Sequence, residues 1–103
     1  MNSEKNRKTA DLLTVCFKAG KAVKGFDPAT EALKKGQVHC IITASDASAK
    51  TVKEVEFHCG RYGAVHLPSG LSKDEIGRLS GKSAAVIAVC DKGFADGFAK
   101  LLK

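Results

Sequence analysis

The residues best suited to bind a ligand in this sequence follow a short apolar stretch that ends near Val23. Gly25 and Phe26 lead directly into Asp27 and Pro28, a pattern typical of a helix start. Glycine permits a sharp turn, an aspartate can cap by accepting from free N–H groups, and proline suits the first helical position. The exposed N–H groups of a helix start attract anions, including phosphate. The segment therefore predicts an anion-binding corner.

The charge balance indicates which anion this corner would bind. The chain has 17 Lys and Arg residues against 11 Asp and Glu residues, with a net charge of +6. A surplus of cations favours polyanions, and nucleic acid presents a uniform phosphate charge. Five Phe, one Tyr and no Trp argue against a platform on which bases stack, so binding would depend on charge and shape. We expect structured RNA as the partner, and no DNA sequence specificity.

Helical and strand patterns alternate along the whole chain. The sequence predicts helices that end at Gly20, run from Asp27 to Lys35, end at Gly60 or Gly63, run from Lys73 to Ser80, and follow Asp91. It predicts strands at Ala22–Lys24, Val38–Ala44, Ala64–Leu67 and Ala84–Val89. This order favours a three-layer α/β/α sandwich with a small mixed four-stranded sheet. With 103 residues and 44% hydrophobic content, we expect one domain, 1–103.

Several other functions are disfavoured by the sequence. No apolar stretch approaches the roughly 18 residues that span a membrane, and no apolar signal core follows Met1–Lys5. The four cysteines lie in or near apolar runs, as expected of buried, reduced thiols. We therefore expect a cytoplasmic protein, and a monomer.

The segment Gly77–Ser83 ends in Gly-Lys-Ser, like a nucleotide-binding phosphate loop, but its spacing and its place between a helix and a strand exclude that loop. The two His-Cys pairs and His66 show no C-x-x-C or H-x-x-x-H spacing that would indicate zinc. No carboxylate pair, activated nucleophile or cofactor loop is evident. We expect no metal, no cofactor and no catalysis.

Several segments of the sequence together resemble a known family. They are Ala19-Gly20-Lys21, Gly25-Phe26-Asp27, Thr43–Ser48, Ile76-Gly77, Gly81-Lys82 and Val89–Ala95. The chain resembles the bacterial YlxQ-type proteins from about Asp11 to Lys103, and that group is similar to the kink-turn-binding ribosomal proteins of archaea and eukaryotes. The resemblance implies an α/β/α sandwich and a non-catalytic RNA-binding protein, associated with the ribosome or translation, that recognises a kink-turn or similarly bent RNA.

The resemblance also implies two RNA-contacting elements. One is the helix start after the first strand, which enters the bent RNA at its tandem sheared G·A pairs, and the other is a loop before the last strand that covers flipped-out nucleotides. By position, the first comprises Lys24, Gly25, Phe26, Asp27 and Pro28, and the second comprises Ser80, Gly81, Lys82, Ser83 and Ala84. We expect phosphate contacts from Lys21 and Arg78 in addition to Lys24 and Lys82.

The corner also leaves an alternative hypothesis open. Relatives usually carry Gly-Thr-Asn-Glu or Gly-Thr-Lys-Gln there, whereas this chain has Gly-Phe-Asp-Pro followed by Glu31. An aspartate can only accept hydrogen bonds, and a proline has no N–H. The same sandwich could thus be a protein-interaction module that has lost specific RNA recognition. In that case Phe26 would be an exposed apolar anchor, unless it folds back against its own helix.

Overall fold

A four-stranded sheet in the order β1-β4-β2-β3 lies at the centre of the structure. The structure is a computed structural model that describes residues 3–103, so Met1 and Asn2 of the N-terminal segment considered above lie outside it. The strands are β1 (Ala22–Lys24), β2 (Cys40–Thr43), β3 (Val65–Pro68) and β4 (Val86–Val89). β2 pairs with β3 in parallel, whereas β4 is antiparallel to both β1 and β2. The prediction of a mixed four-stranded sheet is confirmed.

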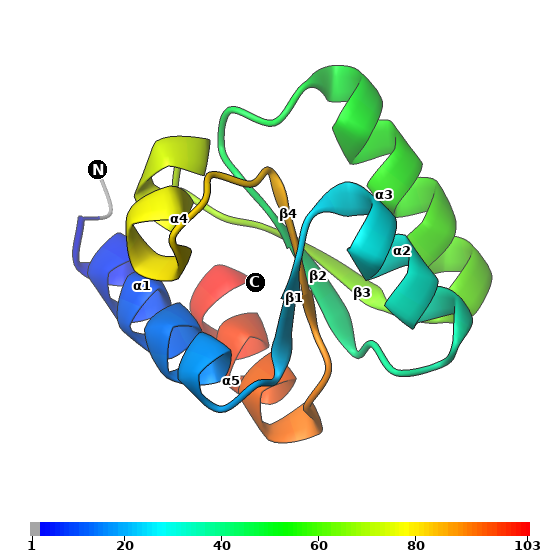
Figure 1. The fold of residues 1–103 in the computed structure, drawn as a ribbon, viewed down its shortest axis with the longest axis horizontal. Coiled ribbons are helices and arrows are strands. Elements are labelled where there is room, and N and C mark those ends of the chain that lie inside the picture. Colours follow the sequence, from blue (N-terminus) through cyan, green and yellow to red (C-terminus); the bar gives the residue numbers. More distant parts are fainter. Residues whose placement is uncertain (1–2) are drawn as a thin grey trace.

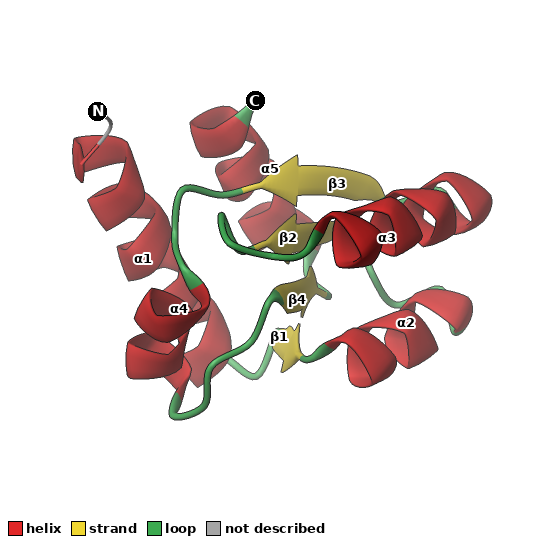
Figure 2. Cartoon of the chain, turned by 90° about the horizontal axis from the view of Figure 1, so that it is seen from above, coloured by secondary structure: helices red, strands yellow, loops and turns green. Residues whose placement is uncertain are grey.

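Helices cover both faces of this sheet (Figures 1 and 2). They are α1 (Ser3–Lys18), α2 (Phe26–Lys34), α3 (Ala49–Tyr62), α4 (Lys73–Ser80) and α5 (Lys92–Leu102). In both views α1, α4 and α5 lie on one side of the sheet, and α2 and α3 lie on the other. The α/β/α sandwich predicted from the sequence is confirmed. None of the helices between residues 3 and 103 has the length and apolar character needed to cross a membrane.

The two central strands supply side chains to two separate cores. Ile42 and Ile87 pack with α1, α4 and α5, whereas Ile41 and Ala88 pack with α2 and α3. Because neighbouring residues of a strand point to opposite faces, each strand contributes alternately to the two cores. Every residue of β2 and β4 is buried, as expected for strands covered on both faces.

The four cysteines are largely shielded from solvent by this packing. Cys16, Cys40 and Cys59 are buried and reduced, while Cys90 is half-buried and also reduced. Burial raises the pKa of the Cys40 thiol to about 12, which keeps it protonated and unreactive at neutral pH.

Strand direction determines which loops meet. β4 is antiparallel to its two neighbours, and β3 is parallel to β2. The carboxyl ends of β1, β2 and β3 therefore lie beside the amino end of β4. We call this end of the strands, with the loops and helix ends that adjoin it, the corner end. The other end of the strands, where β1, β2 and β3 begin, is called the opposite end.

Phe98 provides a test of the core between the sheet and α1, α4 and α5. Its side chain is fully buried, so Phe98→Ala should lower the free energy of unfolding by about 3–5 kcal/mol, measured by chemical denaturation. The matched control is Phe57→Ala on α3, because Phe57 is 62% exposed. This substitution should change the free energy of unfolding by no more than about 0.5 kcal/mol. Equal losses in the two variants would contradict this description of the core.

Candidate nucleic-acid interface

The first predicted element is the start of α2, where the chain turns sharply after β1. Gly25 is the N-cap residue, with φ 105° and ψ 151°. Residues with a side chain rarely adopt this conformation. A Cβ atom at Gly25 would lie 3.4 Å from Cδ of Pro28, which is ordinary contact. The backbone conformation, rather than crowding, therefore requires glycine at this corner.

The predicted capping of this helix is wrong in two details. α2 begins at Phe26, so Asp27 and Pro28 occupy the second and third helical positions, and no side chain caps the helix. The Gly25 N–H is also not free, because it donates to the Val86 carbonyl at 2.8 Å. Proline has no N–H. Within residues 3–103, the first turn of α2 therefore presents two backbone donors without an acceptor, the N–H groups of Phe26 and Asp27.

The second predicted element is the loop between α4 and β4. Gly81 ends α4 with a φ of 94°, and its N–H donates to the Gly77 carbonyl at 2.8 Å. The loop then folds back against the helix, because a Cβ atom at Gly77 would lie only 2.9 Å from the backbone nitrogen of Ser83. Gly77 thus permits the close approach that sets the position of Lys82 and Ser83.

Lys24 connects the two predicted elements directly. Its Nζ donates to the Ser80 carbonyl at 2.8 Å and to the Ser80 Oγ at 3.2 Å. Two of the three ammonium donors are therefore used within the protein, and the side chain is part-buried. The structure brings the helix start and the loop together. It also gives Lys24 a positioning role that spacing in the sequence did not indicate.

Lys21 is separated from the corner. Its carbonyl accepts from the Cys90 N–H at 2.8 Å at the opposite end, where β1 begins. At roughly 3.3 Å per strand residue, Lys21 lies about 13 Å from Gly25 along the chain. Arg78 and Lys82, in contrast, are exposed on α4 and the following loop at the corner end.

Phe26 is not the exposed anchor that the alternative hypothesis requires. Its side chain is half-buried and packs against the core beneath α2 and α3. Its ring lies 6.1 Å from that of His58 between centroids, in an edge-to-face arrangement. The aromatic ring therefore fastens the start of α2 to α3.

A third segment at the corner end was not predicted as part of the site. The Ala44 N–H, just after β2, donates to the Ala85 carbonyl at 2.9 Å. The Asp46 Oδ1 accepts from the Lys73 N–H at 2.9 Å and so joins this segment to the start of α4. The Asp-Ala-Ser sequence between a strand and a helix is the signal in the sequence that marks this segment. The loop before β4 is thus supported on both sides, by β1 and by the segment after β2.

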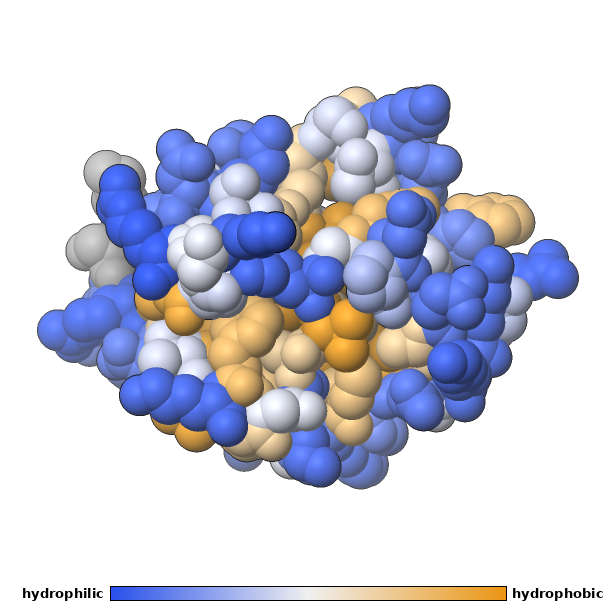
Figure 3. Space-filling model, in the orientation of Figure 1, coloured by the Kyte–Doolittle hydropathy of each residue, from blue (hydrophilic) through white to orange (hydrophobic). Residues whose placement is uncertain are grey.

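The surface around these elements is mixed in character. Figure 3, in the orientation of Figure 1, shows apolar residues across the middle of the side in front of β1, with hydrophilic residues around them. Val23 of β1, and Ala84 and Ala85 of the loop before β4, are partly buried apolar residues that pack against the cores. Such a surface can contact bases, while cations and backbone donors at its margin contact phosphates.

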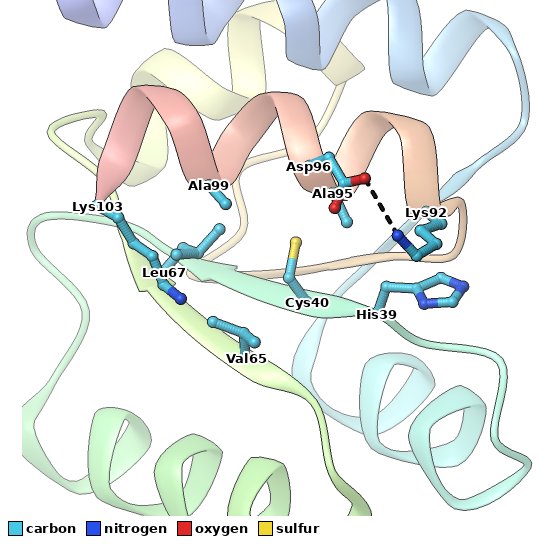
Figure 4. A pocket seen from close by; sticks show the side chains of 9 residues that line it. All are labelled: His39, Cys40, Val65, Leu67, Lys92, Ala95, Asp96, Ala99 and Lys103. Atoms are coloured by element: carbon cyan, nitrogen blue, oxygen red, sulfur yellow. Dashed lines mark hydrogen bonds and ion pairs between the residues drawn. The ribbon is translucent and has the colours of Figure 1, made fainter.

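The described residues also form a pocket far from this interface. It has a volume of about 220 Å³ and lies between α5 and the starts of β2 and β3 (Figure 4). Cys40 and Val65 lie on one side, while Lys92 donates to Asp96 at 3.3 Å on the other. None of the predicted site residues lines this pocket. Within residues 3–103 no three metal-ligating side chains lie close enough to hold a metal ion.

The fold and this interface define a class: a small α/β/α sandwich in which one end presents a helix start and a supported loop side by side. Residues 7–98 match the Ribosomal protein L7Ae/L30e/S12e/Gadd45 family, and the chain belongs to this family.

The relatives agree with this assignment. The chain is 34% identical over 92 residues to the RNA-binding protein YlxQ of Bacillus subtilis (strain 168), covering 88% of this chain and 91% of that protein. A protein with unknown function from Bacillus halodurans C has a solved structure that is 32% identical, with a TM-score of 0.83, covering 89% of this chain and 93% of that one.

A more distant solved structure shares the fold. It is the Giardia lamblia 15.5kD RNA binding protein, which is 18% identical with a TM-score of 0.78, covering 98% of this chain and 87% of that one. The resemblance to YlxQ-type proteins is confirmed, and the family and the name of the Bacillus subtilis relative point to a non-enzymatic protein.

The position of the loop can be tested at Gly77. In Gly77→Ala the added Cβ would meet the backbone of Ser83, so we expect the free energy of unfolding to fall by about 1–3 kcal/mol in chemical denaturation. Gly60→Ala is a matched control, because Gly60 lies inside α3 with open space where a Cβ would be. The free energy of unfolding of that control should rise by about 0.5–1 kcal/mol, because alanine has a higher helix propensity than glycine. A rise in both variants would show that the position of the loop does not depend on a glycine at position 77.

Proposed function

We propose that this protein binds structured RNA through the corner end, without catalysis, and that its RNA is a kink-turn or a similarly bent element of a ribosomal or translation-associated transcript. We further propose that it does so in the cytoplasm, as a monomer of one domain. The observation that carries the proposal is the contact between Lys24 and Ser80, which fixes the helix start and the loop as one surface. The name of the Bacillus subtilis relative, an RNA-binding protein, supports the same partner.

The helix start would contact the bend of the RNA. The free N–H groups of Phe26 and Asp27 lie at the positive end of the α2 dipole, which favours a phosphate oxygen. The Asp27 carboxylate is exposed and can accept hydrogen bonds from amino groups at base edges. Recognition at this point would therefore read base donors rather than base acceptors.

The loop before β4 would contact the adjoining nucleotides. Lys82 and Ser83 are exposed, and Ala84 offers a half-buried apolar surface on which an unstacked base can rest. Arg78 lies one turn earlier on α4 and is also exposed. Phosphate contacts from Lys82 and Arg78 would hold the RNA in register without reading its sequence.

The alternative, a protein-interaction module that has lost RNA recognition, has less support. Its main motivation was an exposed Phe26, and this ring instead packs edge-to-face with His58. Pro28 at the corner and Glu31 further along α2 still distinguish this helix from that of the RNA-binding relatives. A partner retained after nuclease treatment would favour the alternative.

Gly25 tests the proposed interface. Gly25→Ala forces a side chain into a φ of 105°, so the corner should distort and affinity for a kink-turn RNA should fall at least tenfold in a gel-shift titration. Gly63→Ala is the matched control, because Gly63 also has a positive φ, of 79°, but ends α3 at the opposite end. The αL conformation of Gly63 costs a residue with a Cβ about 1–2 kcal/mol, less than the conformation of Gly25, so this control should stay folded and keep its affinity. Equal affinities for kink-turn and straight duplex RNA would refute kink-turn recognition.

Lys82 tests the phosphate contacts. Lys82→Ala should reduce the slope of log affinity against log salt by about 0.9 if the residue contacts one duplex phosphate. Filter binding at several salt concentrations measures this slope. Lys53→Ala serves as the control, because Lys53 is an exposed lysine on α3 away from the loop. An unchanged slope in Lys82→Ala would exclude this phosphate contact.

A further inference from the structure

The positive charge of the chain is not confined to the proposed interface. At the corner end, the loops and the starts of α2, α3 and α4 carry cations among carboxylates. The cations are Lys24, Lys50, Lys73, Arg78 and Lys82, and the carboxylates are Asp27, Asp46, Asp74 and Glu75. α1 also begins at this end, where Asn6 donates to the Gly70 carbonyl, and its first turns add Lys5, Arg7 and Lys8 against Glu4.

A separate group of cations lies at the opposite end of the sheet. There α1, α2 and α3 end, α5 begins, and the connections into β1, β2 and β3 meet the exit from β4 (Figure 1). The cations of this end are Lys18, Lys21, Lys34, Lys35, Arg61 and Lys92, and its carboxylates are Glu31 and Asp91. Asp91 accepts from the Phe94 N–H as the cap of α5, and Lys92 pairs with Asp96.

Four of these lysines are exposed and free to meet a ligand. They are Lys18, Lys21, Lys34 and Lys35, which we call the basic end. The ion pairs found between residues 3 and 103 are those of Lys8 with Glu4, His66 with Glu56 and Lys92 with Asp96, so none involves the basic end. Lysines at helix ends also favour the helix dipole, which accounts for Lys18, Lys34 and Lys35 but not for Lys21, which precedes a strand.

We propose that the basic end is a second RNA-binding surface, which contacts the phosphates of an RNA helix without reading its sequence. The choice of RNA as the polyanion rests on the proposed function, while the surface itself rests on the distribution of charge. A patch of unpaired lysines with few carboxylates gathers polyanions by releasing their counterions.

The placement of this surface has a structural consequence. The corner end and the basic end lie at opposite ends of the strands, in a molecule whose Cα atoms span 26 to 32 Å along its principal axes. One protein molecule can therefore hold a bent RNA at one end and a separate RNA helix at the other. The protein would bring two helices together, either of one folded RNA or of two RNA molecules.

A straight RNA duplex without a bend is the first probe. The variant with Lys18→Gln, Lys21→Gln, Lys34→Gln and Lys35→Gln should bind it at least tenfold more weakly at low salt. Its salt slope should fall by about 0.9 for each lysine that contacts a phosphate. The control has Lys8→Gln, Lys53→Gln, Lys100→Gln and Lys103→Gln, which remove the same charge from exposed positions elsewhere. Arginine at the four basic-end positions should preserve binding.

The second probe is a pair of RNAs, a donor-labelled kink-turn and an acceptor-labelled straight duplex. The unmodified protein should bring them together and give energy transfer, and the basic-end variant should lose this transfer while binding the kink-turn as tightly as the control variant does. If the basic-end and control variants bind and bridge equally, the proposal is overturned. If straight-duplex binding depends on the basic end but the protein shows no preference for a kink-turn, kink-turn recognition at the corner end is refuted. The proposal of an RNA-binding surface at the basic end is then still supported.

Discussion

The pairing of β4 with both β1 and β2 is the constraint on which the rest of the site depends. β4 is antiparallel to both neighbours, so its amino end meets their carboxyl ends. This arrangement sets the loop before β4 beside the start of α2, although Lys24 and Ser80 are 56 positions apart in the sequence. The N–H of Gly25 extends the β1 pairing by one further bond to Val86. If β4 were parallel to its neighbours, the loop before it would lie at the opposite end of the strands.

Burial of the central strands makes this arrangement rigid. β2 and β4 are buried on both faces, and a shift of register by one residue would move each side chain into the wrong core. The loop and the helix start inherit this rigidity, because one is bonded to β4 and the other to β1. Phe26 adds a contact from the start of α2 to α3. The surface is therefore formed before any ligand binds, which lowers the ordering cost of binding.

Much of the fold could be predicted from the sequence because its signals are local. The runs Val38–Ala44 and Ala84–Val89 are almost wholly apolar, as in buried strands, and Ser72 and Glu75 have the spacing of the capping box that begins α4. The start of α2 was less predictable, because Asp27 and Pro28 suit a cap and first position but take the second and third instead. Glycine, which has no side-chain acceptor, holds the cap position because the backbone conformation excludes other residues.

The contacts within the site could not be predicted, since they join distant parts of the chain. Nothing local to Lys24 indicates that its ammonium would be held by Ser80. Lys21 and Lys24 are three residues apart, yet a strand between them places them at different ends of the sheet. Spacing along the chain identifies charged residues, but strand direction decides which of them share a surface.

The distribution of charge separates selectivity from attraction in this molecule. At the corner end, carboxylates of the loops and helix starts lie among the cations, so binding there depends on the fit of backbone donors and an acceptor at Asp27 to a bent RNA as well as on attraction. At the basic end, unpaired lysines attract any phosphate chain but have no fixed partners that could distinguish one sequence from another. Cations alone would hold straight and bent RNA alike, so the carboxylates among the cations of the corner favour discrimination by shape.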